Sequence, residues 1–534
     1  MKSKVFEAVL AIAPFIILLS SLFTKPPFEV YTGPTYFDGN SAYDYLVILC
    51  SMFKGRVVGS ERDFSAGYWV VKEFEELGYK VHLQNFTTRG FYGPVKAMNV
   101  YAIKKGIIDR YIIIMAHRDI VPSTIEGAND NGAGVAILIE LARVFAKRNT
   151  TLSIIFLCTD SEETGLHGAR FFVDNFPELS RIVCAVSIDM CGWKDSSGIS
   201  LIAYYYPPKF CDASLLLIAL SLRSLKYNVI IDPLDEIMAR LQLVFAGTDS
   251  MPFIAKDVPA FGVSDYPLYP YWHKVEDTLD KVSPTRLQVV GEFMERLILT
   301  IDSMEGLPEL SQHYLIIGEV YLPWYSLYLT TLLVFAFTIV RIIKYTRPSK
   351  RGVINYLLLY SLTLVITSLI TPLCMSLRSF TLSSTIALAI YIICILLIVR
   401  KVKFDLKGIQ GISLIAFDFL YLSSSLLNPE VALTILTPTM YTSALIRRIR
   451  KYRRVLALIA GLASISPWMI LLSYVFSTYG YRFTDRLLCY LAKFASYKLG
   501  LLAYIALPAA TSLILVTVIT SILVILKSSS AHEE

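Results

Sequence analysis

The stretch that decides the fold is Tyr111-Ile112-Ile113-Ile114-Met115-Ala116-His117-Arg118-Asp119. Its apolar, β-branched half predicts a buried strand, and its polar half leaves the end of that strand. Open α/β sheets carry their chemistry at such strand ends. A second polar stretch, Gly127-Ala128-Asn129-Asp130-Asn131-Gly132, follows shortly after. Histidine and carboxylates at this spacing are the ligands that zinc prefers, although a polar turn after a core strand has the same composition.

Strands and helices alternate on both sides of this stretch. The pattern predicts helices at 40–52, 61–77, 132–147, 165–175, 212–226 and 284–303, and strands at 79–87, 111–116, 151–159, 181–189, 199–204, near 229 and at 260–263. Such alternation predicts an α/β fold, with a three-layer, mostly parallel sheet covered by helices on both faces. Residues 25–307 are therefore expected to form one domain.

The rest of the chain is too apolar for a soluble protein. Hydrophobic residues make up 55% of the sequence and the mean hydropathy is +0.55, with the excess outside 25–307. Residues 5–23 follow Lys2 and Lys4 and predict an uncleaved signal anchor rather than a cleaved signal peptide, because the run is nearly a full span and no A-x-A site follows. Seven further spans are expected at 321–343, 353–373, 381–399, 408–427, 430–446, 455–477 and 499–526.

The basic residues indicate how these spans are oriented. The net charge of +7 comes mainly from short loops between apolar spans, and alternate loops are strongly basic. This pattern favours membrane orientation over a nucleic-acid surface. It predicts a signal-anchor helix (1–24), an extracytoplasmic domain (25–307), a juxtamembrane linker (308–320), a seven-helix transmembrane domain (321–527) and a cytoplasmic tail (528–534). The chain would then be an integral membrane protein of about eight spans with both termini cytoplasmic.

Two other features carry less information. The eight cysteines include no CxxC pair, so the five in the domain are expected to be buried thiols, with one disulfide left open. Asp418 is the only ionisable residue well inside a predicted span, which is thin support for a transport path. The C-terminal spans could also bind other membrane proteins.

Later strand ends supply more ligand-type residues. The strand at 151–159 runs into Glu162 and Glu163, the strand at 181–189 ends at Asp189, and His273 lies just before the last helix of the domain. Adjacent carboxylates are usually a solvated pair. Here they follow a buried strand, where two like charges are costly unless a cation neutralises them.

Five ordered blocks resemble the di-zinc aminopeptidase family, which also contains glutamate carboxypeptidases and glutaminyl cyclases. The blocks are Ala116-His117-Arg118-Asp119, Gly127-Ala128-Asn129-Asp130-Asn131-Gly132-Ala133-Gly134, Glu162-Glu163-Thr164-Gly165-Leu166-His167-Gly168-Ala169, Ile188-Asp189-Met190, and His273 through Asp277-Thr278. The resemblance implies two Zn²⁺ ions bridged by Asp130. It also implies that His117 and Asp189 complete one metal position, and Glu163 and His273 the other.

The same resemblance implies roles for two more residues. Asp119 would orient His117, and Glu162 would be the general base. His167 occupies no ligand position of the family, and Trp272 stands where relatives often have tyrosine. Asp249 matches a family position near the active site, without an assigned role.

The expected function is that of a membrane-anchored zinc exopeptidase, favoured as an aminopeptidase, that hydrolyses peptide substrates outside the cytoplasm. The layout resembles endoplasmic-reticulum metallopeptidases of this family. It also resembles the peptidase-like subunit of the GPI transamidase, so the alternative is a scaffold or substrate-recognition subunit. A scaffold has no need for five metal ligands and a base, and here all six positions are filled. The sequence leaves aminopeptidase, carboxypeptidase and amidotransferase chemistry open.

Overall fold

The computed structural model describes residues 28–205, 209–231 and 247–308 without interruption. It also describes 314–317, 320–323, 349–368 and single positions or short runs before residue 17 and between 326 and 340. The chain divides into two compact units, one of residues Lys25–Glu319 and one that combines Met1–Thr24 with Val320–Glu534.

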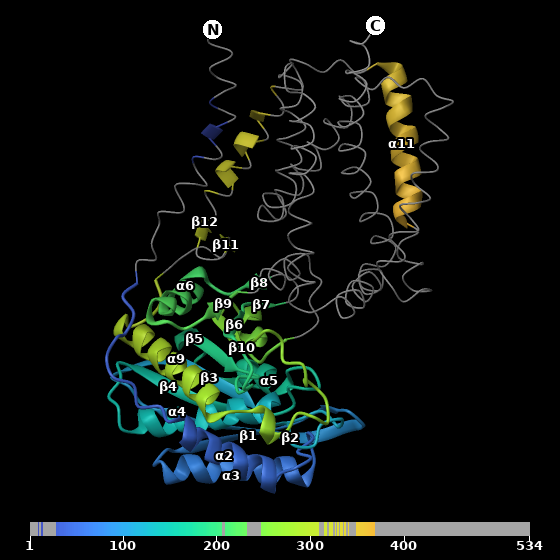
Figure 1. Ribbon diagram of the computed structural model, residues 1–534. Coiled ribbons are helices and arrows are strands. Elements are labelled where there is room, and N and C mark those ends of the chain that lie inside the picture. Colours follow the sequence, from blue (N-terminus) through green and yellow to red (C-terminus); the bar gives the residue numbers. More distant parts are fainter. Residues whose placement is uncertain are drawn as a thin grey trace. The chain divides into compact units, whose positions relative to one another are not determined.

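A mixed eight-stranded sheet is the centre of the Lys25–Glu319 unit (Figure 1), in the order β1-β2-β4-β3-β5-β10-β6-β9. The strands are β1 (Val81–Gly90), β2 (Gly93–Lys104), β3 (Ile108–His117), β4 (Leu152–Thr159), β5 (Ile182–Ile188), β6 (Gly198–Ile202), β9 (Val229–Ile230) and β10 (Ala260–Tyr266). Short strands β7 (Tyr204–Tyr205) and β8 (Lys209–Phe210) pair separately. The predicted α/β class is confirmed.

The sheet is parallel at its centre and mixed toward its flanks. The β4–β3, β3–β5, β5–β10 and β6–β9 pairs are parallel, whereas the β1–β2, β2–β4 and β6–β10 pairs are antiparallel. The expectation of a mostly parallel sheet therefore holds for the four central strands and for the β6–β9 edge. Two of the antiparallel pairs involve β2, which the sequence pattern did not predict. It follows β1 after a two-residue turn, and such a short connection permits only antiparallel pairing.

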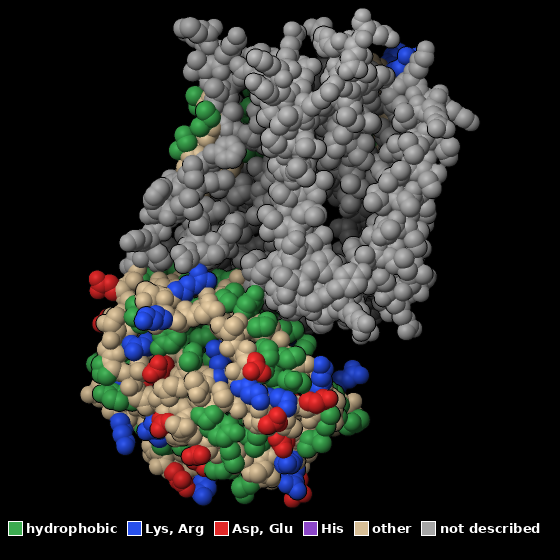
Figure 2. Space-filling view, viewed as in Figure 1, with side chains coloured by type: hydrophobic (Ala, Val, Ile, Leu, Met, Phe, Trp, Pro, Cys, Tyr) green, Lys and Arg blue, Asp and Glu red, His purple; other side chains and the backbone are tan. Residues whose placement is uncertain are grey.

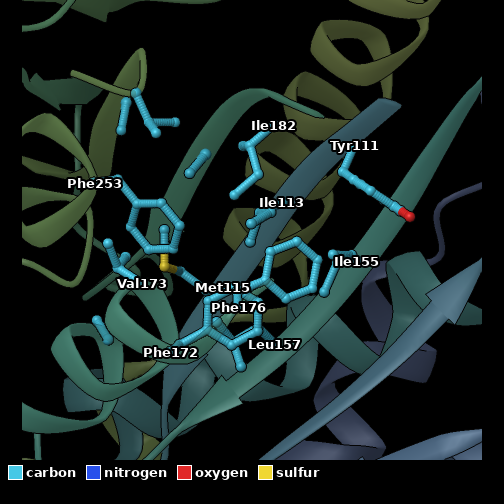
Figure 3. Packing of buried hydrophobic residues seen from close by; sticks show 14 of the residues in the cluster. Tyr111, Ile113, Met115, Ile155, Leu157, Phe172, Val173, Phe176, Ile182 and Phe253 are labelled. Atoms are coloured by element: carbon cyan, nitrogen blue, oxygen red, sulfur yellow. The ribbon is translucent and has the colours of Figure 1, made fainter. Parts of the chain in front are cut away.

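Helices cover both faces of the sheet. Helices α2 (Gly39–Met52), α3 (Glu61–Glu76), α4 (Ala133–Ala146) and α9 (Pro284–Ser303) pack together on one side, where Phe74 and Phe145 contact Phe156 of β4. On the other side, α5 (His167–Asn175) and α8 (Met251–Ala255) pack on alternate residues of the same strands (Figure 3). Because helices cover both faces of the sheet, every residue of the central strand β4 is buried.

Residues 31–38, which we call the N-terminal strap, are fastened across α9 by buried carboxylates. The Glu295 side chain accepts hydrogen bonds from the backbone N–H groups of Tyr36 (2.9 Å) and Phe37 (2.9 Å). Glu140 of α4 accepts from the backbone N–H of Asp38 at 3.0 Å. The strap is therefore part of the packed unit. Among the described residues of this unit, the remaining α-helix is α6 (Ala213–Ser221).

Beyond this unit, the described elements include α11 (Lys350–Ser368), which overlaps the predicted span 353–373. No helix among the described residues is both long enough and apolar enough to cross a membrane. The predicted spans from 381 to 526 and the tail at 528–534 lie outside the described residues, as does most of the predicted anchor at 1–24. Those predictions, the linker at 308–320 and the seven-helix domain at 321–527 stay predictions.

Candidate active site

Three neighbouring strand ends form the floor of the candidate site. Strand β3 lies between β4 and β5 and runs parallel to both, with His117 in register with Thr159. His117 is the last residue of β3, Glu162 and Glu163 follow the end of β4, and Asp189 follows the end of β5. Since parallel strands end at the same edge of a sheet, these side chains from distant parts of the sequence meet there.

Asp130 stands between two imidazoles. Its Oδ1 lies 3.5 Å from Nε2 of His117, which is also 3.5 Å from Oδ1 of Asp189. Its Oδ2 lies 3.5 Å from Nε2 of His273, which is 2.8 Å from Oε2 of Glu163. The five side chains predicted as ligands therefore form two adjacent groups that share the Asp130 carboxylate. The first group is His117, Asp130 and Asp189, and the second group is Asp130, Glu163 and His273.

Most of these distances fit donor atoms that share a zinc ion. Donor atoms about 2.0–2.2 Å from a tetrahedral zinc are about 3.3–3.6 Å apart, which matches three of the four separations. The 2.8 Å separation between Glu163 and His273 is that of a direct hydrogen bond instead. Oε1 of Glu163 and Oδ1 of Asp189 are buried without a hydrogen-bond partner. Buried oxygens of this kind need a cation or a donor.

The electrostatics of the site also favour a cation. Burial, together with the carboxylates of Glu163 and Asp189, raises the pKa of Asp130 well above its ordinary value. Burial likewise raises the pKa of Glu163 to about 8. Burial alone lowers the pKa of His117, but the carboxylates of Glu162, Asp119 and Asp189 outweigh it and raise that pKa. A divalent cation between the two groups would offset this excess of negative charge.

Asp119 links one ligand to the loop that carries two other site residues. Its Oδ1 lies 3.6 Å from Nδ1 of His117, whose closer partner is the backbone oxygen of Asp119 at 3.1 Å. The same carboxylate accepts hydrogen bonds from the backbone N–H groups of Glu162 (3.1 Å) and Glu163 (3.2 Å). Burial raises the pKa of Asp119, but hydrogen bonds to His117 and these two amides lower it more. Asp119 therefore fits the predicted orienting role and also fixes the Glu162–Glu163 loop.

Glu162 lies beside both groups of ligands, because its carboxylate belongs to a cluster with His117 of one group and Glu163 of the other. It is 9% exposed, so it is close to solvent yet largely desolvated. Burial raises its pKa well above the ordinary value, and the carboxylates of Glu163 and Asp189 add to the shift. A carboxylate whose proton affinity is raised in this way is suited to general base chemistry near neutral pH.

Asn131 is a supporting residue for which the sequence predicted no role. Its Nδ2 donates to the backbone oxygen of Ile188 (2.7 Å), and its Oδ1 accepts from the backbone N–H groups of Met190 (3.3 Å) and Gly134 (3.0 Å). Ile188 and Met190 flank Asp189, so Asn131 fixes the Asp130 turn against the end of β5. That turn is the short helical element η1 (Ala128–Gly132), which has non-helical backbone angles at residues 130 and 131.

Asp277 is a second supporting residue for which the sequence predicted no role. Its Oδ1 accepts from the backbone N–H of Asn129 (2.8 Å), and its Oδ2 accepts from the backbone N–H of Asp130 (3.1 Å). It is fully buried. Asp277 belongs to the sequence block that begins at His273, but the family resemblance implied no role for this residue.

Two buried arginines underlie the site. Arg118 pairs with Asp63 (3.0 Å) and Asp160 (2.8 Å) and is fully buried, as both carboxylates are. Arg56 donates to the backbone oxygens of Arg118 (2.6 Å) and Gly127 (2.7 Å), and also to that of residue 126. These contacts hold the loop that connects the polar stretch at 116–119 to the polar stretch at 127–132.

The other residues singled out from the sequence lie near the site without joining the ligand groups. Asp249 is fully buried and accepts a hydrogen bond from Oγ1 of Thr159, and burial raises its pKa to about 7. The Trp272 ring lies 4.4 Å from the His273 ring, centroid to centroid. His167 begins α5 and is in no ligand group of the described residues. The five cysteines of the unit are buried thiols that form no disulfide, as expected.

Comparisons with known proteins find similarity over the part of the chain that contains the site. Residues 99–298 match the family model described as Peptidase family M28. The aminopeptidase YwaD of Bacillus subtilis is 27% identical over 224 residues, which are 40% of this chain and 46% of that protein. A putative endoplasmic reticulum metallopeptidase 1 of Schizosaccharomyces pombe is 27% identical over 195 residues, which are 31% of this chain and 23% of that protein. The chain thus spans less than half the length of either relative.

Among solved structures, the aminopeptidase from Aneurinibacillus sp. strain AM-1 matches with a TM-score of 0.42 and 17% identity. The match covers 53% of this chain and 97% of that one. Residues 99–298 are thus similar to peptidase family M28, and the curated relatives that match this unit include an aminopeptidase and a putative metallopeptidase.

Proposed function

We propose that this protein is a zinc-dependent aminopeptidase that holds two zinc ions on the edge of the sheet. The observation that carries the proposal is Asp130, whose two carboxylate oxygens each lie 3.5 Å from a different imidazole. His117 and Asp189 would hold one ion with Asp130, and Glu163 and His273 would hold the other. Bound zinc supplies a Lewis acid that polarises a peptide carbonyl and makes water more acidic.

Glu162 is the proton carrier in this proposal. Its carboxylate takes a proton from the water whose oxygen attacks the carbonyl carbon, and returns it to the amine nitrogen as the carbon–nitrogen bond breaks. The raised proton affinity of its buried carboxylate supports both halves of that cycle. Asp119 keeps Glu162 in place through the backbone N–H of that residue.

The test uses the full-length protein, stripped of metal with a chelator and reloaded with zinc. One peptide is offered with a free N-terminus, with an acetylated N-terminus and with an amidated C-terminus. We expect zinc-dependent release of the first residue only when the amine is free. Glu162→Gln should lower kcat by about 10²–10⁴ with unchanged zinc content. Glu76→Gln, the same substitution at an exposed site on α3, should have no effect.

Three results would contradict the proposal. The absence of bound zinc would refute the metal centre, and zinc binding without hydrolysis of any peptide would favour a scaffold role. Cleavage that requires a free C-terminus instead would make the protein a carboxypeptidase.

We further propose that the α/β unit is extracytoplasmic and anchored in the lipid bilayer by the predicted spans at 5–23 and 321–526, with both termini cytoplasmic. The alternation of basic loops supports this topology. A reporter inserted after Lys350 should lie on the cytoplasmic side, and one inserted within residues 85–95 on the opposite side. Detection of both reporters on one side would refute the topology.

A further inference from the structure

The loop that carries His273 is not held by regular structure. It connects β10 to α9, and His273 itself adopts a left-handed backbone conformation with φ +58°. By contrast, His117 is the last residue of strand β3, and Asp189 directly follows β5. Contacts with residues outside the strands must therefore fix the distance between His273 and Asp130.

Two residues at equal distances from His273 along the chain close this loop. Tyr269 lies four residues before it and Asp277 four residues after it, and the Tyr269 hydroxyl donates to Oδ1 of Asp277 at 2.8 Å. Tyr269 is 2% exposed and Asp277 fully buried, so this hydrogen bond is shielded from water. The base of the loop is thereby fixed.

The Asp277 carboxylate also attaches the closed loop to the Asp130 turn. Its two oxygens accept from the backbone N–H groups of Asn129 and Asp130 at 2.8 and 3.1 Å. Its backbone oxygen accepts from the N–H of Ala128 at 3.4 Å. Asp277 thus contacts two of the three segments that supply ligands to the group of Asp130, Glu163 and His273. The first group has a separate support, since Asn131 fixes the Asp130 turn to β5.

We infer that Asp277 is a positioning residue that sets the distance between His273 and Asp130, and so governs the metal position of Asp130, Glu163 and His273 more than that of His117 and Asp189. The inference rests on the two-zinc proposal for its metal readout. Its structural readout does not depend on metal or on activity.

The first experiment measures hydrogen exchange in metal-free, full-length protein. Asp277→Asn replaces one acceptor oxygen with an N–H donor that faces backbone N–H groups. The amides of Asn129 and Asp130 should exchange at least about tenfold faster in this variant, because hydrogen bonds to a charged acceptor are lost. Asp280→Asn makes the same change at an exposed carboxylate in the next turn and should leave both amides unchanged. Equal exchange in the two variants would overturn the inference.

A milder variant covers the case in which Asp277→Asn does not fold. Tyr269→Phe keeps the ring, which packs edge-on against Trp193 and Tyr271, and removes only the hydroxyl that closes the loop. It should accelerate amide exchange in residues 271–276. If exchange there is unchanged, the hydrogen bond does not hold the loop.

The second experiment counts retained zinc in two backgrounds during dialysis against chelator. In His117→Ala, where the second position is the intact one, adding Asp277→Asn should remove the remaining zinc. In His273→Ala it should remove little. Equal loss in both backgrounds would show a general structural role and refute the inference. If the wild-type protein binds no zinc, the proposed function is refuted. The exchange experiment still tests the positioning role of Asp277, because it uses metal-free protein.

Discussion

Replacement of Arg118 tests whether the ion cluster beneath the site supports the fold. The guanidinium is fully buried between Asp63 and Asp160, at 3.0 and 2.8 Å, and also donates to the backbone oxygen of Met98 at 2.7 Å. Arg118→Met keeps an unbranched apolar side chain but leaves two buried carboxylates without a cation. Breaking a buried pair in this way costs about 3–5 kcal/mol. Domains are typically stable by about 5–15 kcal/mol, so the variant would lose much of its margin.

The assay is hydrogen exchange of the slowest amides in β3 and β4 of the full-length protein, which reports the global opening of the α/β unit. We expect their opening free energy to fall by about 3–5 kcal/mol in Arg118→Met. Arg110→Met, on the exposed start of the same strand, should change it by no more than about 0.5 kcal/mol. Adding Asp160→Asn to Arg118→Met should recover part of the loss, because it removes one unpaired charge. A loss below about 1 kcal/mol in Arg118→Met would refute the reasoning.

Three further predictions follow from other contacts. Glu295→Ala should release the N-terminal strap, with faster amide exchange in residues 36 and 37, and protection equal to wild type would contradict this. Gly134→Ala should destabilise the α/β unit by about 1–3 kcal/mol and weaken zinc retention, because its Cβ would lie 2.3 Å from Oδ1 of Asn131; thermal unfolding and zinc content test this. Without metal, the folded-state pKa values of Glu163 (about 8) and Asp249 (about 7) exceed their ordinary values, so the folded protein binds more protons than the unfolded chain. Stability should therefore rise as the pH falls from about 8.5 to about 6.5, and zinc should flatten this slope; a fall over that range without metal would contradict it.

The sequence predicted those elements whose signals are local. The helix expected at 284–303 is observed as Pro284–Ser303, because Ser283 caps its first turn and proline is favoured at its first position. The strand expected at 151–159 is observed as Leu152–Thr159, since a continuous apolar run is typical of a strand buried on both faces. Strand β2 was missed because its burial does not alternate cleanly, and its pairing depends on β1 and β4.

The ligand-type residues could be singled out because histidine and carboxylates at strand ends are unusual. Their pairing into two groups came from the family resemblance, not from spacing, and the structure brings the same five side chains together. The supporting residues had no such signal. Asn131 and Asp277 bind backbone atoms that are 57 and 148 residues away, and Arg56 follows Lys54-Gly55, a sequence typical of an exposed turn. Long-range contacts with backbone atoms leave no local pattern.

On the face of the α/β unit shown in Figure 2, acidic and basic side chains are interspersed.

The most direct test of the central claim is an anomalous diffraction measurement at the zinc edge on crystals of the zinc-loaded protein. Two peaks are expected, one beside His117 and Asp189 and the other beside Glu163 and His273, with the Asp130 carboxylate between them. A single peak, no peak, or peaks that do not contact Asp130 would contradict it.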